Sequence, residues 1–154
     1  MDEPDKRRRL AALESCCRDR GVPCTSRRRI ILDTVLDLND HPSADQVFEA
    51  VSRRRAGISR ATVYRTLETL AELALITKAC HPGRVVRYDP RVDLHHHLVC
   101  LRCDKVIDIF DGRLDALPSP DTSAHGFEVT DHRVQFRGLC GDCAGKKAKS
   151  PEGG

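Results

Sequence analysis

Two cysteine pairs with the spacing of metal ligands lie in the C-terminal part of the sequence. Cys100-x-x-Cys103 and Cys140-x-x-Cys143 are separated by 36 residues. Four thiolates from two such pairs can surround one tetrahedral Zn²⁺ ion. The start of the chain, MDEPDKRRRL, has no apolar signal segment, so we expect a reducing, cytoplasmic environment in which disulfides are rare. We therefore predict one structural zinc per subunit rather than free or disulfide-bonded thiols.

Three consecutive histidines precede the first of these pairs, in the stretch DLHHHLVCLRCDKVID, residues 93–108. On a β-strand alternate side chains share a face, so His95 and His97 would point the same way. Asp108, on the following predicted strand, would lie near them. Imidazole and carboxylate donors suit iron, manganese, nickel or zinc. The spacing predicts a nitrogen and oxygen metal site beside the zinc site and leaves the metal open.

Helices are predicted throughout the N-terminal half of the chain. Ser43 and Gln46 have the pattern of a capping box, and Ser59 can cap the last helix, in which Val63 and Leu67 begin a buried stripe. Two amphipathic helices joined by a short turn with glycine are typical of a helix-turn-helix motif. The predicted helices cover residues 5–20, 27–38, 44–55 and 60–73.

Two β-rich segments follow within residues 75–90, around a turn at His81-Pro82-Gly83, and predict the wing of a winged helix. Residues 1–90 contain 17 Lys and Arg against 13 Asp and Glu, a modest basic excess that is compatible with DNA binding. An ordinary helical bundle with a hairpin remains an alternative. The candidate DNA-binding residues, which can reach bases or phosphates from the last helix and the second helix, are Arg28, Ser59, Arg60, Thr62, Tyr64 and Arg65.

The C-terminal half is predicted to be a small α+β domain. Strands are expected over residues 95–101 and 105–110, a short helix within 111–120, and another strand or two within 126–138. No apolar run reaches the roughly 18 residues of a membrane span. The predicted organisation is a DNA-binding domain over 1–88, a hinge over 89–94, a dimerisation and metal-binding domain over 95–145, and a disordered tail over 146–154.

Residues 20–143 resemble the ferric uptake regulator (Fur) family of bacterial metal-dependent repressors. The resemblance is carried by ordered motifs at matching intervals. These are T-S-R-R-R-I-I-L (25–32), H-P-S-A-D-Q-V-F (41–48), S-R-A-T-V-Y-R-T-L (59–67), R-Y-D (87–89), H-H-H-L-V-C-L-R-C-D-K-V-I-D (95–108) and G-L-C-G-D-C (138–143).

The resemblance implies a winged-helix domain, a hinge and a dimerisation domain, with a regulatory metal site of His41, Asp89, His95, His97 and Asp108. Aspartates at positions 89 and 108 match the peroxide-sensing branch of the family, in which Fe²⁺ or Mn²⁺ occupies this site. Iron-catalysed oxidation would then fall on His41 and His95. The implied protein is a homodimeric repressor of palindromic operator DNA, not an enzyme, with no organic substrate and no membrane partner.

The sequence departs from the family pattern beside the histidine cluster, where Leu94 replaces a histidine and His96 an aspartate. A second site of His96, Asp115 and His132 is therefore expected to be weak at most. Cys16, Cys17, Cys24 and Cys80 are interpreted as packing or surface residues, with redox activity of one of them as the alternative.

Three other functions remain open. The first is a repressor of the same family that responds to iron or another metal but not to peroxide. The second is an iron oxygenase with two histidines and one carboxylate, which would need a larger β-barrel than this half of the chain provides. The third is a zinc-containing interaction module without a DNA role.

Overall fold

The computed structural model describes residues 3–38, 40–79 and 85–145, and the chain divides into two compact units, Met1–Val92 and Asp93–Gly154. The turn predicted at 81–83, Cys80 and the tail predicted over 146–154 lie outside the described residues. Among the described residues, none of the helices has the length and apolar character needed to cross a bilayer.

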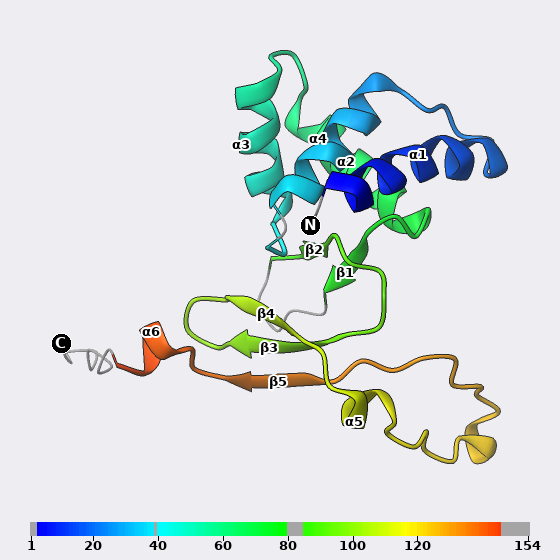
Figure 1. Cartoon of the computed structure of the whole chain (residues 1–154), viewed down its shortest axis with the longest axis vertical. Helices are drawn as coiled ribbons and strands as arrows, with labels where there is room; N and C mark the ends of the chain where they lie inside the picture. The colour runs from blue at the N-terminus through cyan, green and yellow to red at the C-terminus, as the bar shows by residue number, and fades with distance from the viewer. Residues whose placement is uncertain (1–2, 39, 80–84, 146–154) are drawn as a thin grey trace. The chain divides into compact units, whose positions relative to one another are not determined.

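The first unit contains four helices followed by a β-hairpin (Figure 1). Strand β1 pairs with β2 in antiparallel register, with Thr77 opposite Asp89. The helix-turn-helix and the paired strands after it confirm the fold class predicted for this half. The elements are α1 (Glu3–Asp19), α2 (Ser26–Leu38), α3 (Ala44–Arg54), α4 (Arg60–Glu72), β1 (Thr77–Ala79) and β2 (Arg87–Asp89).

Capping and an apolar stripe explain the position of α3 and α4. The Ser43 hydroxyl accepts from the Gln46 backbone N–H while the Gln46 side chain accepts from the Ser43 N–H, which completes the capping box at α3. Ser59 caps α4 by accepting from the backbone N–H of Thr62 at 3.2 Å. Val63 and Leu67 are fully buried in a core shared by all four helices. The buried stripe fixes which face of α4 remains exposed.

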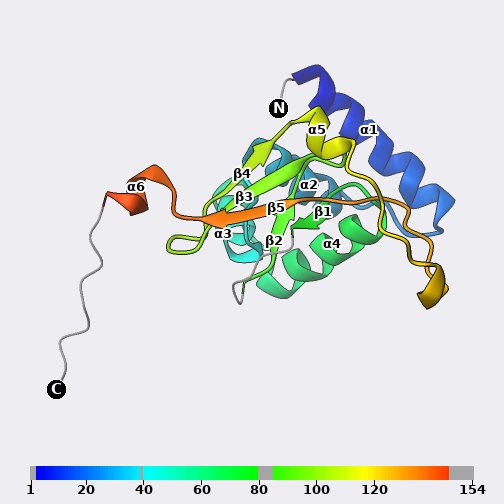
Figure 2. The same cartoon turned by 90° about the horizontal axis from the view of Figure 1, so that it is seen from below.

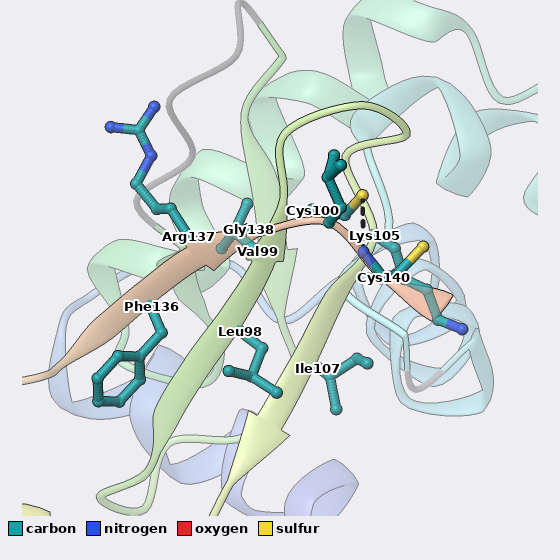
Figure 3. Close-up of a pocket in the computed structure, with 10 residues that line it drawn as sticks. Leu98, Val99, Cys100, Lys105, Ile107, Phe136, Arg137, Gly138 and Cys140 are labelled. Atoms are coloured by element: carbon teal, nitrogen blue, oxygen red, sulfur yellow. Dashed lines mark hydrogen bonds between the residues drawn. The ribbon is translucent and has the colours of Figure 1, made fainter. Parts of the chain in front are cut away.

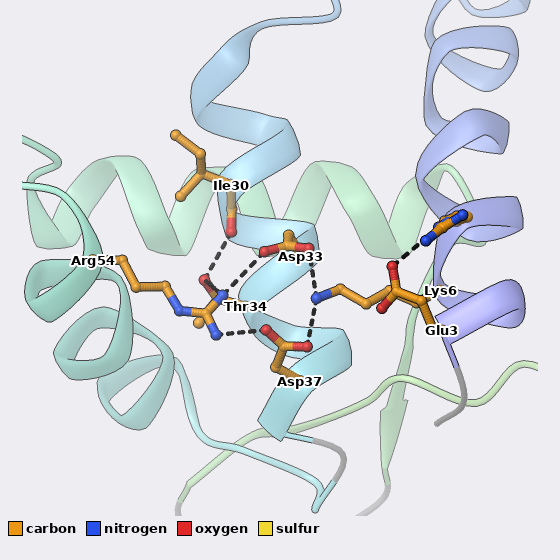
Figure 4. A network of polar contacts seen from close by, with 8 residues as sticks. Glu3, Lys6, Ile30, Asp33, Thr34, Asp37 and Arg54 are labelled. Atoms are coloured by element: carbon orange, nitrogen blue, oxygen red, sulfur yellow. Dashed lines mark hydrogen bonds and ion pairs between the residues drawn. The ribbon is translucent and has the colours of Figure 1, made fainter.

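A network of ion pairs joins α1, α2 and α3 (Figure 4). The Lys6 Nζ lies 2.7 Å from Asp33 Oδ1 and 2.5 Å from Asp37 Oδ1. The Arg54 guanidinium donates to the same two carboxylates from α3. Burial opposes ionisation of Asp37, but the hydrogen bonds from Lys6 and Arg54 outweigh it and lower the pKa of this carboxyl. The network therefore stabilises the packing of three helices in the ionised form.

Replacing Asp37 with Asn is expected to destabilise the first unit by about 1 kcal/mol, the sum of two partly exposed ion pairs. Because the folded-state pKa of Asp37 is lowered, its contribution is present above the unfolded pKa of about 3.9 and is lost as the pH falls through the folded value. Urea unfolding at neutral and acidic pH measures the free energy of unfolding of the variant and of wild type. The difference between these two free energies should shrink in acid. The control is Asp19→Asn, which changes an exposed carboxylate at the end of α1. An equal difference at both pH values would contradict the role of the ion pairs.

The second unit is built on a three-stranded sheet of order β4-β3-β5 (Figure 2). The central strand β3 is antiparallel to β4 and parallel to β5. Only one strand forms within residues 126–138, and Pro118 and Pro120 follow soon after the short helix α5. The elements are β3 (His96–Cys100), β4 (Val106–Ile109), α5 (Gly112–Asp115), the 3₁₀ helix η1 (Ser123–His125), β5 (Gln135–Gly138) and α6 (Gly141–Ala144). Helices and a mixed sheet together confirm the predicted α+β class.

Candidate functional site

The four cysteines of the two pairs converge at one end of the sheet of the second unit. Cys100 ends β3 and Cys103 follows in the turn to β4, whereas Cys140 precedes α6 and Cys143 lies within it. All four Sγ atoms lie within 4.8 Å of one another, and those of Cys103 and Cys140 are 3.7 Å apart. Sulfur ligands about 2.3 Å from a tetrahedral zinc would be about 3.8 Å apart. The cluster therefore has the donors and the size of a structural zinc site.

The pKa values of two thiols in this cluster are shifted in opposite directions. Hydrogen bonds from the backbone, first from the Cys140 N–H at 3.4 Å, lower the pKa of Cys100 to about 6. Burial raises the pKa of Cys143 to about 12. A divalent cation favours the thiolate form of each ligand, so zinc binding should release protons from this site and weaken in acid.

Two histidines and one carboxylate face one another at the sheet of the second unit, with His95 directly before β3. His97 on β3 lies directly opposite Asp108 on β4. Both His95 Nε2 and His97 Nε2 lie 3.8 Å from Asp108 Oδ1, and the two nitrogens are 3.0 Å apart. Nitrogen ligands about 2.1 Å from an ion and at right angles to each other would be about 3.0 Å apart. These three side chains form what we call the sheet donor group.

The tautomer of His95 suits a metal ligand. Its Nδ1 lies 2.8 Å from the backbone carbonyl oxygen of Asp93. Because a carbonyl can only accept, the proton is assigned to Nδ1, which leaves the lone pair on Nε2 toward His97 and Asp108. Metal-binding histidines characteristically donate their second N–H to a carbonyl or carboxylate in this way.

The first unit carries a second donor group, formed by His41 and Asp89 and here called the helical-unit donor group. His41 Nε2 lies 3.6 Å from Asp89 Oδ2, and Asp89 Oδ1 accepts from the Arg91 backbone N–H at 2.7 Å. Asp89 ends β2. His41 lies between α2 and α3 with φ of 40°, a left-handed conformation that non-glycine residues adopt rarely and often at functional positions. The pair offers one nitrogen and one oxygen ligand.

His96, Asp115 and His132 also meet in the second unit, but hydrogen bonds already engage them. His96 Nδ1 accepts from the Val134 backbone N–H at 3.0 Å, and its Nε2 lies 3.0 Å from Asp115 Oδ1. The His132 ring stacks on His96 with 6.1 Å between centroids and donates from Nε2 to the Leu114 carbonyl at 2.7 Å. A metal here would have to replace the His96–Asp115 hydrogen bond.

A basic hollow of about 690 Å³ lies in the first unit between the start of α2, the end of α3 and α4. Three of the residues expected to bind DNA, Arg28, Thr62 and Arg65, line it. Arg27 and Arg55 line it as well. Arg55 was not predicted from the sequence because its place beside α4 depends on how α3 packs. The hollow concentrates four guanidinium groups on one surface.

Arg60 and Tyr64 lie elsewhere on α4, where both interact with Asp45 of α3. The Arg60 guanidinium donates to Asp45 Oδ1 and stacks 4.8 Å from the centroid of the Phe48 ring. The Tyr64 hydroxyl donates to the same carboxylate at 3.1 Å. Ser59 is the cap of the helix. The six expected DNA-binding residues thus divide into a capping residue, a pair held by Asp45, and three residues in the basic hollow.

Comparison with known proteins agrees with these features. The family model of the ferric uptake regulator family matches residues 19–137. A peroxide-responsive repressor, PerR, of Staphylococcus saprophyticus is 31% identical over 129 residues, which cover 84% of this chain and 87% of the relative.

Two solved structures share the fold. The Campylobacter jejuni peroxide stress regulator matches with a TM-score of 0.64 and 26% identity, over 76% of this chain and 88% of that one. The ferric uptake regulator of Helicobacter pylori matches with a TM-score of 0.75 and 18% identity, over 93% of this chain and 96% of that one. Members of the matched family are transcription regulators rather than enzymes. The protein belongs to the ferric uptake regulator family.

Proposed function

We propose that the protein is a homodimeric, metal-dependent repressor that binds palindromic operator DNA in the cytoplasm and senses hydrogen peroxide. The observation that carries the proposal is the sheet donor group, with two histidine nitrogens 3.0 Å apart and an aspartate opposite them. Nitrogen and carboxylate ligands suit Fe²⁺ and Mn²⁺. The similarity to peroxide-responsive repressors supports peroxide as the signal.

One regulatory ion would be shared by the two donor groups, with His41 and Asp89 from the first unit and His95, His97 and Asp108 from the second. The covalent chain supports this arrangement. Asp89 and His95 are six residues apart, and six fully extended residues span at most about 20 Å. The segment 89–94, which includes Pro90, would act as the hinge that allows both groups to reach the same ion.

An ion held by both groups would restrict the orientation of the DNA-binding domain relative to the dimerisation domain. In a two-fold dimer this orientation sets the distance between the two α4 helices, which must enter major grooves one or more helical turns apart. A shift from 1:99 to 99:1 in favour of the DNA-competent orientation requires about 5.5 kcal/mol of differential metal affinity. The ligands thereby couple metal binding to DNA binding.

Peroxide sensing depends on which metal the five ligands hold. When bound, Fe²⁺ supplies the electrons that reduce hydrogen peroxide, whereas Mn²⁺ does not react in this way. The residues expected to be oxidised are His41 and His95, one from each donor group. Oxidation of either ring would remove a nitrogen ligand and with it the connection between the domains. The cluster of His96, Asp115 and His132 is proposed as a weak additional site only.

An apolar face of the sheet supports the homodimer (Figure 3). Leu98 on β3 lies opposite Ile107 on β4 and Phe136 on β5, so the three side chains form one row. Their exposed fractions are 43%, 43% and 46%. Leu139, which lines the same pocket as these three residues, is also exposed. Contiguous exposed apolar residues on a small domain are typical of an interface, and a second copy of the chain is the partner that a two-fold repressor requires.

The basic hollow is expected to contact operator phosphates. Arg65→Ala should weaken binding to all DNA sequences and reduce the slope of log affinity against log salt concentration by about 0.9 for each phosphate that the protein no longer neutralises. Fluorescence anisotropy over a range of salt concentrations measures both. Arg113→Ala, which removes an exposed arginine paired with Asp111 in the second unit, is the matched control. An unchanged slope in the Arg65 variant would exclude the hollow from the interface.

Selection from a random DNA library tests the repressor function without knowledge of the operator. With Mn²⁺-loaded protein we expect enrichment of one palindrome whose half-sites are related by two-fold symmetry. The same selection with metal-free protein should yield no enrichment. Equal enrichment in both would contradict metal control of DNA binding, and no enrichment in either would favour the zinc-containing interaction module.

A further inference from the structure

Two cysteines that the proposed metal sites do not use lie together at the end of α1. Cys17 and Cys24 line one small hollow of about 380 Å³, with Glu14, Arg18 and Val22. Cys17 is in the last turn of α1 and only 1% exposed, within the core of the first unit. Cys24 is exposed on the segment that leads into α2. One thiol of the pair is thus open to solvent and the other is not.

The backbone turn between them holds this arrangement. Gly21, two residues after the end of α1, has φ of 63°, and the Val22 N–H donates to the Cys17 carbonyl at 2.9 Å. A left-handed residue followed by a hydrogen bond spanning six residues is the Schellman motif. It reverses the chain over Cys17 and returns Cys24 to the same hollow. The pair is therefore positioned by local structure.

The surroundings of Cys17 keep its thiol protonated. Burial raises the pKa of Cys17, and the neighbouring Cys24 thiol raises it further, while the positive charge of Arg28 acts in the opposite direction. A buried protonated thiol is a poor first nucleophile. It remains able to react with an oxidised sulfur brought next to it. Oxidation would therefore begin at the exposed member of the pair.

We propose that Cys17 and Cys24 form a redox-active dithiol that a hydroperoxide oxidises to an intramolecular disulfide. The Cys24 thiolate attacks the terminal oxygen of the peroxide and the O–O bond breaks. The leaving group is hydroxide or, for an alkyl peroxide, alkoxide, and it takes a proton to leave as water or as an alcohol. Cys24 is then a sulfenic acid. The Cys17 sulfur attacks the Cys24 sulfur, its proton leaves with the hydroxyl group as water, and the S–S bond forms. Two thiols lose two electrons, which reduce one peroxide.

The disulfide would act on the rim of the basic hollow, a consequence that rests on the proposed DNA binding. Cys24 lies between Pro23 and Thr25, both of which line the hollow. The Arg28 side chain donates to the Pro23 carbonyl, and the Arg28 backbone N–H donates to the Thr25 hydroxyl at 3.2 Å. A disulfide between Cys24 and the buried Cys17 would hold this rim in a different position. We expect weaker operator binding in the oxidised form, independent of the regulatory metal.

Peptide mapping of the full-length protein tests the dithiol directly. Zinc-replete, Mn²⁺-loaded protein is treated with a small excess of hydrogen peroxide, remaining thiols are alkylated, and non-reduced tryptic peptides are analysed by mass spectrometry. We expect a disulfide between the peptide of residues 10–18 and that of 21–27, retained in Cys16→Ser and absent in Cys24→Ser. Fully alkylated Cys17 and Cys24, or a link from Cys24 to Cys16 or Cys80 instead, would overturn the proposal.

Operator binding separates this inference from the proposed function. Peroxide should lower the affinity of Mn²⁺-loaded wild type by about tenfold or 1.4 kcal/mol, thiol reductants should restore it, and Cys24→Ser should keep its affinity. Zinc content is followed in parallel, so that oxidation of the zinc cysteines is recognised by metal release. A disulfide that forms in a protein whose reduced form binds no DNA would contradict the proposed function but leave the dithiol intact. A disulfide without effect on operator affinity would overturn the proposed control of the rim.

Discussion

Replacing Cys143 with serine is expected to remove the zinc and unfold the sheet unit while the helical unit remains folded. The sheet has three strands of four or five residues, and the row of Leu98, Ile107 and Phe136 is exposed. A small domain of this kind depends on its metal, and structural zinc contributes about 10–16 kcal/mol of binding free energy at neutral pH. The binding free energy that is lost with the zinc should therefore exceed the free energy of unfolding of this unit.

Metal analysis and hydrogen exchange measure this outcome. Zinc should fall from one per chain to nearly none, and amide protection should be lost over residues 93–145 but retained over 26–72. Light scattering should show that the proposed homodimer dissociates into monomers. Cys16→Ser, which changes a partly buried cysteine outside the cluster, should leave all three readings unchanged. One zinc per chain in the Cys143 variant would rule out the four-cysteine site.

His97→Ala is expected to abolish metal-dependent operator binding while leaving zinc and the dimer intact. His97 contributes one of the two nitrogens of the sheet donor group and lies on the central strand opposite Asp108. Loss of a ligand should weaken Mn²⁺ binding by at least the roughly 10–100-fold seen for changes to groups that only support a ligand. The affinity for operator at limiting Mn²⁺ should fall in proportion.

Calorimetric Mn²⁺ titration and anisotropy of labelled operator test this prediction. His125→Ala is the matched control, because His125 lies in the 3₁₀ helix η1 and has no expected ligand role. Excess Mn²⁺ should partly restore operator binding in the His97 variant if its domains can still adopt the DNA-competent orientation. Operator binding equal to wild type at limiting Mn²⁺ would show that the sheet donor group does not control DNA binding.

The predictable parts of the protein are those that local sequence determines. The capping box of Ser43 and Gln46 and the cap at Ser59 mark the starts of α3 and α4, because caps act within four residues. The alternation of side chains on a strand was sufficient to place His95 and His97 together and to bring Asp108 opposite. The C-x-x-C spacing likewise indicated four thiols in one cluster.

The less predictable parts depend on packing between distant elements. Asp45 holds Arg60 and Tyr64 from another helix, and Lys6 meets Asp37 across 31 residues of chain. No periodicity marks such pairs. The proximity of Cys17 and Cys24 was equally hidden, since it arises from the reversal of the chain at Gly21. His41 and Asp89 entered only through the family resemblance, because they lie 48 residues apart in the sequence and no local spacing connects them.

The most direct test of metal-controlled repression compares operator binding by metal-free, Mn²⁺-loaded and Fe²⁺-loaded protein before and after hydrogen peroxide, under anaerobic handling. Both metal forms should bind operator and the metal-free form should not. After peroxide, only the iron form should show one added oxygen on His41 or His95 by mass spectrometry. The release of DNA is measured in a Cys24→Ser background, which excludes the Cys17–Cys24 disulfide. In that background only the iron form should release DNA. Operator binding by the metal-free form would contradict metal control, and an iron form that keeps its histidines and its DNA would make the protein an iron-responsive repressor instead.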